Sequence, residues 1–122
     1  MIQKNTRLNI ADNSGAKQVM CISVPRVGAR KTAQLGETII ISVKSAVPRS
    51  QVKKKEIHQA VIVRQKKPFL RRDGSSIRFD ENAVVLINPD KLPKGTRVFG
   101  PIAREVREKG YPKLISMAPE VV

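Results

Sequence analysis

The sequence predicts a mainly β fold, a small barrel or sandwich of short strands followed by two small helices. Apolar residues recur at every second position through most of the chain, a spacing typical of half-buried strands. Clusters of turn-forming residues separate these runs, and only the last fifth of the chain has helical spacing. We expect the barrel, because closure removes the exposed edges that a short open sheet keeps. The 122 residues fit one domain over 1–122.

Six segments are predicted to be strands: 6–11, 17–24, 39–44, 57–64, 77–80 and 83–87. In the third segment Ile39, Ile41 and Val43 share one face, which we expect to point into the core. Ile77 and Phe79 are expected to point inward in the same way. The last segment is continuously apolar, which predicts a strand buried on both faces.

Turn and helix signals complete the order of elements. Residues 12–15 (Asp-Asn-Ser-Gly) form a turn cluster, and residues 73–74 (Asp-Gly) suit a tight hairpin because both residues tolerate positive φ. The C-terminal helical segment covers about residues 101–118. Its first helix is expected to begin at Pro101, whose missing N–H costs nothing in a first turn, and to end at Gly110. A second short helix follows.

The charge of the chain is its most unusual property. Lys and Arg total 24 against 10 Asp and Glu, which gives a formal net charge of +14. Repulsion of this size weakens an isolated fold, so we infer a polyanionic partner; nucleic acid is favoured, because cations that bind phosphates release counterions. Residues 44–72 contain ten cations and one acid, Glu56, and therefore nine of the fourteen net charges. The ten are Lys44, Arg49, Lys53, Lys54, Lys55, Arg64, Lys66, Lys67, Arg71 and Arg72.

These cations gather on predicted turns and strand ends in two sub-clusters, 53–55 and 66–72. That position favours a phosphate-binding surface over the solvated face that a charge run more commonly marks. Proteins that bind single strands stack bases on aromatic side chains, but this chain has three Phe, one Tyr and no Trp. We therefore expect backbone and shape contacts to folded RNA.

The residues give no indication of catalysis, and we expect neither a cofactor nor a small-molecule substrate. His58, the only histidine, is expected at the surface, and Cys21, the only cysteine, in the core. No metal-ligand spacing and no Gly-rich phosphate loop occurs. The apolar runs are too short to span a bilayer and we see no leader segment, so we expect no membrane partner and a cytosolic or organelle-interior location.

An ordered set of motifs resembles the universal large-subunit ribosomal protein fourteen family over essentially the whole chain. The motifs are, in order, Met1-Ile2-Gln3, residues 11–17, Ala60-Val61-Ile62-Val63, Asp73-Gly74, Phe79, Asn82, Gly95-Thr96-Arg97, Phe99-Gly100-Pro101 and residues 118–121. The resemblance implies a five-stranded antiparallel barrel, a β-hairpin that projects near residues 73–74, and two short C-terminal helices.

The resemblance also implies a function, as a structural constituent of the large ribosomal subunit. It implies binding to large-subunit rRNA, contact with neighbouring large-subunit ribosomal proteins, a bridge to small-subunit rRNA, and docking of a ribosome-silencing factor. We assign RNA binding to the ten cations of 44–72 and to Arg78. We assign the partner and intersubunit surface to Thr96, Arg97, Arg104 and Lys113.

Three segments depart from the family pattern. Lys55 stands where a turn glycine is common, and Tyr111-Pro112 replaces a more usual Phe-Met. Residues 24–32 differ from the family's usual loop, and Pro25 there is expected to end strand pairing because it has no N–H.

Two other functions are compatible with a basic β domain. One is a free-standing RNA-binding module, such as a translation factor or RNA chaperone, for which aromatic stacking would be expected. The other is a metal-free nuclease that uses the acidic grouping Asp73, Asp80, Glu81 and Asp90, although turn and cap roles explain these residues better.

Overall fold

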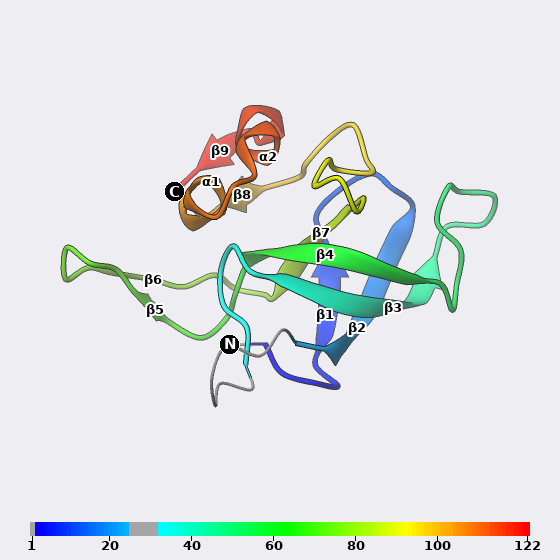
Figure 1. Cartoon of the computed structure of the whole chain (residues 1–122), viewed down its shortest axis with the longest axis horizontal. Helices are drawn as coiled ribbons and strands as arrows, with labels where there is room; N and C mark the ends of the chain where they lie inside the picture. The colour runs from blue at the N-terminus through cyan, green and yellow to red at the C-terminus, as the bar shows by residue number, and fades with distance from the viewer. Residues whose placement is uncertain (1, 25–31) are drawn as a thin grey trace.

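Five strands form a closed barrel in the computed structural model, which describes residues 2–24 and 32–122. They are β1 (Arg7–Ile10), β2 (Ala16–Ser23), β3 (Thr38–Ala46), β4 (Ile57–Arg64) and β7 (Ala83–Ile87). Each pairs with the next in that order, and β7 returns to β1 (Figure 1). The predicted barrel is confirmed, with every strand end within two residues of its expected place. The loop that contains Pro25 lies outside the described residues.

One pairing in the barrel is parallel. The pairs β1–β2, β2–β3, β3–β4 and β4–β7 are antiparallel, whereas β1 and β7 run in the same direction, with Asn9 opposite Ala83. Five strands that alternate in direction cannot close without one such pair, because the first and the last then point the same way. The expectation of a wholly antiparallel barrel is wrong at this seam.

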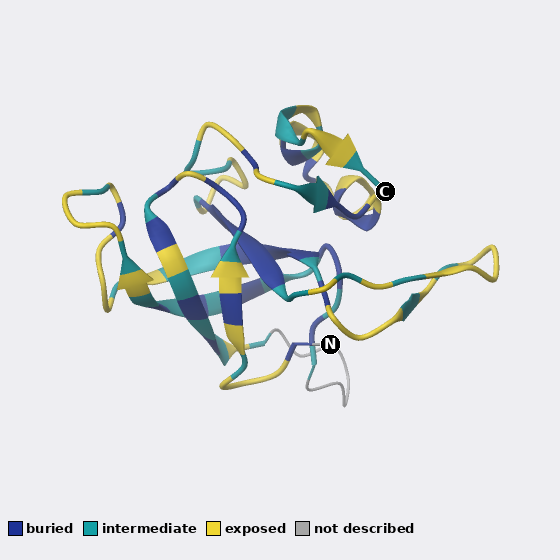
Figure 2. Cartoon of the chain, turned by 180° about the vertical axis from the view of Figure 1, so that it is seen from behind, coloured by how far each residue is buried: buried dark blue, intermediate teal, exposed yellow. Residues whose placement is uncertain are grey.

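A second, smaller hairpin projects from the barrel. It consists of β5 (Phe69–Leu70) and β6 (Ser76–Ile77), and it extends away from one end of the molecule (Figures 1 and 2). The strand predicted over 77–80 is therefore too long, since β6 ends at Ile77 and Phe79 donates its N–H to the carbonyl of Gln65 instead. Ile77 and Phe79 pack against the barrel core but stay half-buried.

The barrel strands bury both of their faces near the C-terminal segment. Inside the barrel, Cys21, Ile41 and Leu86 are fully buried, as expected for Cys21. On the outside of β4 and β7, Val61 and Val85 are also fully buried, because the C-terminal helices cover them (Figure 2). Coverage on both faces explains why residues 83–87 are continuously apolar.

The C-terminal segment begins as a strand and not as a helix. Pro101–Ile102 forms β8, which pairs in parallel with β9 (Glu120–Val121). The helix expected from Pro101 therefore starts four residues later, as α1 (Glu105–Glu108), and α2 (Pro112–Met117) follows. Ile102 and Val106 are both buried in the same apolar cluster although Ile102 lies on a strand. Their spacing of four residues therefore does not distinguish a strand from a helix at Pro101–Ile102.

Tyr111 joins this segment to the barrel. The side chain is 5% exposed, and its hydroxyl shares a hydrogen bond with the hydroxyl of Thr38 at the start of β3. This hydrogen bond links the C-terminal segment to the first residue of β3.

Tyr111→Phe should lower the free energy of unfolding by about 1 kcal/mol, the usual net contribution of one such hydrogen bond. Chemical denaturation of the wild type, Tyr111→Phe, Thr38→Val and the double variant measures it. If the bond accounts for the loss, the second substitution adds little to the first. Fully additive losses would show that the two hydroxyls do not depend on each other.

Asp12 and Asp73 form two turns with the same hydrogen-bond pattern, one buried and one exposed. Asp12 Oδ1 accepts hydrogen bonds from Ser14 N (3.1 Å) and Ser14 Oγ (2.6 Å), and Asp73 Oδ1 accepts them from Ser75 N (3.0 Å) and Ser75 Oγ (2.6 Å). Asp12 is buried and also accepts from Leu86 N on β7, whereas Asp73 is exposed at the tip of the hairpin. Both predicted turns are thereby confirmed.

We expect these carboxyls to titrate on opposite sides of the ordinary aspartate value of 3.8. Burial raises the pKa of Asp12 above it, and the hydrogen bonds from Ser75 lower the pKa of Asp73. Asp12 therefore favours the fold below its unfolded pKa and loses this contribution as the pH rises through its folded pKa. Asp73 contributes above its unfolded pKa and loses its contribution as the pH falls. Carbon-detected NMR titration measures both values, and shifts of the same sign would contradict the assignment to burial.

Candidate nucleic-acid interface

The loop between β3 and β4, together with the end of β3, displays five of the predicted RNA-binding cations. We call Lys44, Arg49, Lys53, Lys54 and Lys55 the loop array. All are exposed except Lys44, which is half-buried near the end of β3. The side chain of Val52 attaches the loop to the barrel, because it is 1% exposed and packs in the barrel core.

Hydrogen bonds hold the backbone of this loop in one form. Val47 N donates to the carbonyl of Gly15 (2.7 Å), and Ser50 Oγ lies within 2.7 Å of the carbonyl oxygens of Val47 and Val52. At its far end Lys55 N donates to the carbonyl of Val43 on β3 (2.8 Å). The cations therefore stand on a defined scaffold.

Lys55 occupies a left-handed backbone conformation, with a φ of 73°. The turn thus needs a backbone conformation that glycine adopts readily, and the lysine bears a conformational cost. Lys55→Gly should raise the free energy of unfolding by up to about 1 kcal/mol, since relief of the strain exceeds the entropy that glycine adds to the unfolded chain. Lys54→Gly, at a neighbouring position without positive φ, is the control and should lower it. Thermal denaturation measures both, and a loss of stability in Lys55→Gly would contradict the strain.

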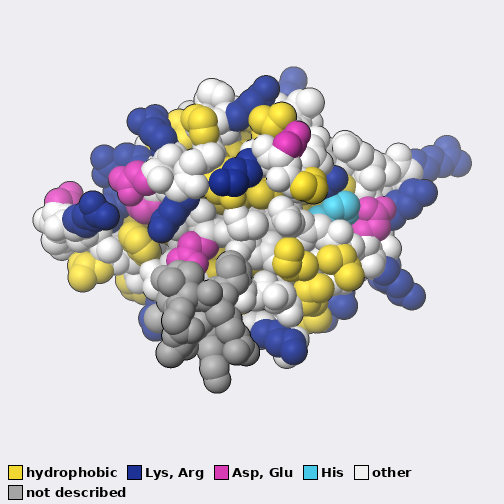
Figure 3. Space-filling model, in the orientation of Figure 1, with side chains coloured by type: hydrophobic (Ala, Val, Ile, Leu, Met, Phe, Trp, Pro, Cys, Tyr) yellow, Lys and Arg dark blue, Asp and Glu magenta, His cyan; other side chains and the backbone are white. Residues whose placement is uncertain are grey.

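The projecting hairpin displays the second group of cations. We call the exposed residues Lys66, Lys67, Arg72 and Arg78 the ribbon array. They lie along or at the base of the β5–β6 hairpin, at the opposite end of the molecule from the β3–β4 loop (Figures 1 and 2). The stretch that looks continuous in the sequence is thus divided into two arrays, and Lys and Arg side chains are visible at both ends of the face in Figure 3.

Arg64 and Arg71, both predicted to bind RNA, form ion pairs with glutamates in the described part of the chain. Arg64 Nη2 lies 3.5 Å from Glu81 Oε1, and its guanidinium lies so close to Gly100 that a Cβ there would stand 2.4 Å from Nη1. Arg71 donates to Glu105 Oε1 from Nε (3.0 Å) and Nη2 (2.9 Å), and Nη2 also reaches the carbonyl of Val122 (2.5 Å). The geometry favours a structural role for these two arginines.

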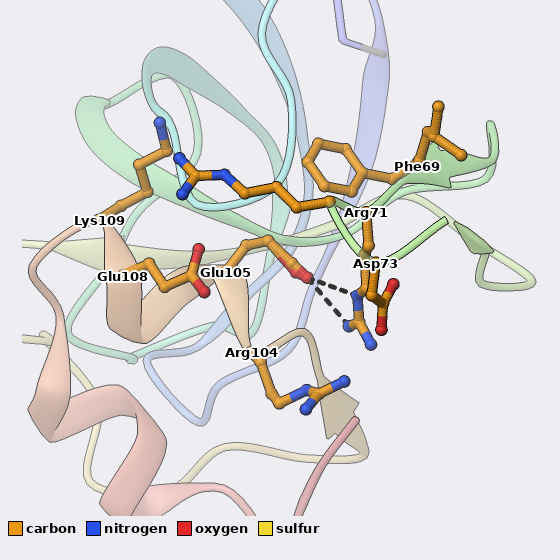
Figure 4. A pocket seen from close by; sticks show the side chains of 9 residues that line it. Phe69, Arg71, Asp73, Arg104, Glu105, Glu108 and Lys109 are labelled. Carbon is orange, nitrogen blue, oxygen red and sulfur yellow. Dashed lines mark hydrogen bonds and ion pairs between the residues drawn. The ribbon is translucent and has the colours of Figure 1, made fainter. Parts of the chain in front are cut away.

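A cleft of about 480 Å³ separates the projecting hairpin from α1 (Figure 4). Its charged lining consists of four cations and three carboxylates: Arg71, Arg72, Arg104 and Lys109, and Asp73, Glu105 and Glu108. Of these cations only Arg72 belongs to the ribbon array, and Arg71 is paired with Glu105.

The four residues of the predicted partner surface lie on three different elements. Thr96 and Arg97 lie on the turn after β7, where both backbone N–H groups donate to Asn13 Oδ1, at 2.8 and 3.0 Å. Lys113 is exposed on α2. Arg104 lines the cleft beside the hairpin, next to Asp73. The rigid turn is the part of this surface that the structure defines best.

Sequence reasoning missed a pair of side chains beside the loop array, Glu56 and His58. His58, expected at the surface, is half-buried, and its Nε2 lies 2.7 Å from Glu56 Oε2. Glu56 is the only acid among the ten cations, and this isolation was the available signal.

The comparison with known families decides which kind of protein carries these arrays. The sequence matches the family described as ribosomal protein L14p/L23e over residues 1–122, its full length. The chain belongs to this family. Its members are structural proteins of the large ribosomal subunit and not enzymes. The chain is therefore a structural ribosomal protein of this subunit, and RNA binding is expected of it.

Two further observations concern residues 2–24 and 32–122. No group of three or more His, Cys, Asp or Glu residues in these ranges could hold a metal ion. None of the helices described there is long and apolar enough to cross a bilayer.

Proposed function

We propose that this chain binds large-subunit rRNA through the loop array and the ribbon array and contributes to a bridge with small-subunit rRNA. The observation that carries the proposal is the position of exposed cations at both ends of a compact barrel from a ribosomal family. Two separate cationic ends can contact two RNA segments at once. Phosphates would then offset the repulsion that a net charge of +14 creates.

The aromatic residues support binding to folded RNA. All four lie among the described residues: Tyr111 is buried, Phe69 and Phe79 are half-buried, and Phe99 is 53% exposed. A single exposed ring is a poor platform for stacking successive bases. Contacts to phosphates and to the shape of the RNA therefore remain as the main mode of binding.

The predicted partner surface completes the proposal. Thr96, Arg97, Arg104 and Lys113 would face small-subunit rRNA or a docked ribosome-silencing factor, and other faces would contact neighbouring large-subunit proteins. The site of action would be the ribosome, in the cytoplasm or in the interior of an organelle.

Fractionation tests the proposal. A tagged copy of the chain, separated on sucrose gradients in high salt, should sediment with large-subunit particles. A protein that stays at the top of the gradient, and that binds unstructured oligonucleotides tightly, would instead be a free-standing RNA-binding module.

A further inference from the structure

The acid next to the loop array, Glu56, makes hydrogen bonds that define the shape of the turn at Lys53–Lys55. Glu56 Oε1 accepts a hydrogen bond from the backbone N–H of Lys53 (3.0 Å), and the backbone N–H of Glu56 donates to the carbonyl of Lys53 (3.3 Å). Both backbone groups of Lys53, its N–H and its carbonyl, are thus hydrogen-bonded to Glu56. The side chain acts on the backbone of the turn and makes no ion pair with a lysine side chain in the described part of the chain.

Two further contacts fix the position of this carboxylate. Its Oε2 lies 2.7 Å from Nε2 of His58, whose side chain is only 15% exposed. The carbonyl of Glu56 also accepts from Val43 N on β3 (2.9 Å), so its backbone belongs to the barrel. The bond to His58 is the largest cause of a lowered pKa for Glu56, because it stabilises the ionised carboxylate.

We propose that Glu56, supported by His58, is a positioning residue that holds Lys53, Lys54 and Lys55 in the arrangement in which they meet RNA phosphates. This inference rests on the proposed function. Three adjacent lysines repel one another, and Lys55 must keep a φ of 73°. A carboxylate that accepts the first N–H of the turn opposes both tendencies. RNA then binds a turn that is already ordered in the free protein. The conformational entropy lost on ordering the turn therefore does not reduce the affinity.

The inference and simple electrostatics predict opposite signs for one substitution. Removal of an acid from a basic surface should strengthen RNA binding if Glu56 acts only through its charge. If Glu56 positions the turn, Glu56→Ala should weaken binding by about tenfold, because the lysines must be ordered on contact. Glu120→Ala is the charge-matched control, since Glu120 is exposed on β9 and makes no side-chain hydrogen bond in the described structure.

The experiment measures the affinity of the full chain for deproteinised large-subunit rRNA by filter binding, with amide hydrogen exchange at Lys53. We expect Glu120→Ala to bind as tightly as the wild type or more tightly. Glu56→Ala should bind more weakly, with faster exchange of the Lys53 N–H. Glu56→Gln keeps an oxygen acceptor and should recover part of the affinity, and His58→Ala should lose part of it.

Two results would overturn the inference: Glu56→Ala binds as tightly as Glu120→Ala, or exchange at the Lys53 N–H is unchanged in Glu56→Ala. The exchange measurement also detects a general loss of structure, because core amides such as Ile41 would then exchange faster as well. The proposed function fails separately, if replacement of all three lysines leaves the affinity and its salt dependence unchanged.

Discussion

Replacement of Lys53, Lys54 and Lys55 with alanine should weaken binding to large-subunit rRNA and flatten its dependence on salt. Each phosphate contact that is lost should lower the slope of log affinity against log salt by about 0.7 to 0.9, so three contacts lower it by about 2 to 3. The three side chains are exposed on a turn that hydrogen bonds hold against β3. Filter binding over a range of salt concentrations measures the slope.

A variant with the same total charge separates local contacts from the general field. Lys4, Lys17 and Lys109 are exposed outside both arrays, and their replacement with alanine removes the same three charges. Its slope should stay close to that of the wild type. Equal slopes for the two triple variants would mean that the loop array has no special role.

Arg71→Ala and Arg72→Ala should affect different properties although the residues are adjacent. The first should reduce stability, and the second should reduce the salt dependence of RNA binding. Arg71 is 15% exposed and binds Glu105, which is 9% exposed, so its removal leaves a buried carboxylate without its cation. We expect Arg71→Ala to lower the free energy of unfolding by about 3 kcal/mol, the low end for breaking a buried ion pair, because Arg71 is still partly exposed. Arg72 is exposed in the ribbon array, and its loss should reduce the salt slope by about 1 with little effect on stability.

Denaturation and salt-dependent binding of both variants measure this difference. Glu105→Gln offers a further check, because the amide keeps the shape of the side chain but removes the charge that Arg71 neutralises. A stable Arg71→Ala variant with a flattened salt slope would show that Arg71 contacts RNA and that its pairing with Glu105 is secondary.

The two-residue spacing of apolar side chains and the clusters of turn-forming residues were sufficient to predict the barrel. Every barrel strand has a clear apolar run, and the turn at 12–15 has the side chains that its hydrogen bonds require. The parallel seam follows from the number of strands, which local pattern does not show. Pro101 suited a helix start as well as a short strand, and only pairing with Glu120, distant in sequence, distinguishes the two.

The candidate site was predictable in composition but not in arrangement. The sequence identifies the cations, yet it cannot show that a hairpin carries one group to the opposite end of the barrel from the other. Nor can it show that Arg71 meets Glu105, 34 positions away, or that Glu56 turns back onto Lys53. Pairing of charges depends on tertiary contacts, so a count of cations overstates the surface available to RNA.

Crosslinking of lysine and arginine side chains to RNA in purified large-subunit particles tests the central claim most directly. We expect crosslinks to large-subunit rRNA from both arrays, with Lys53–Lys55 and Arg72 prominent and Arg71 absent. Particles in which neither array crosslinks to RNA, while the chain sediments with the subunit, would contradict the account.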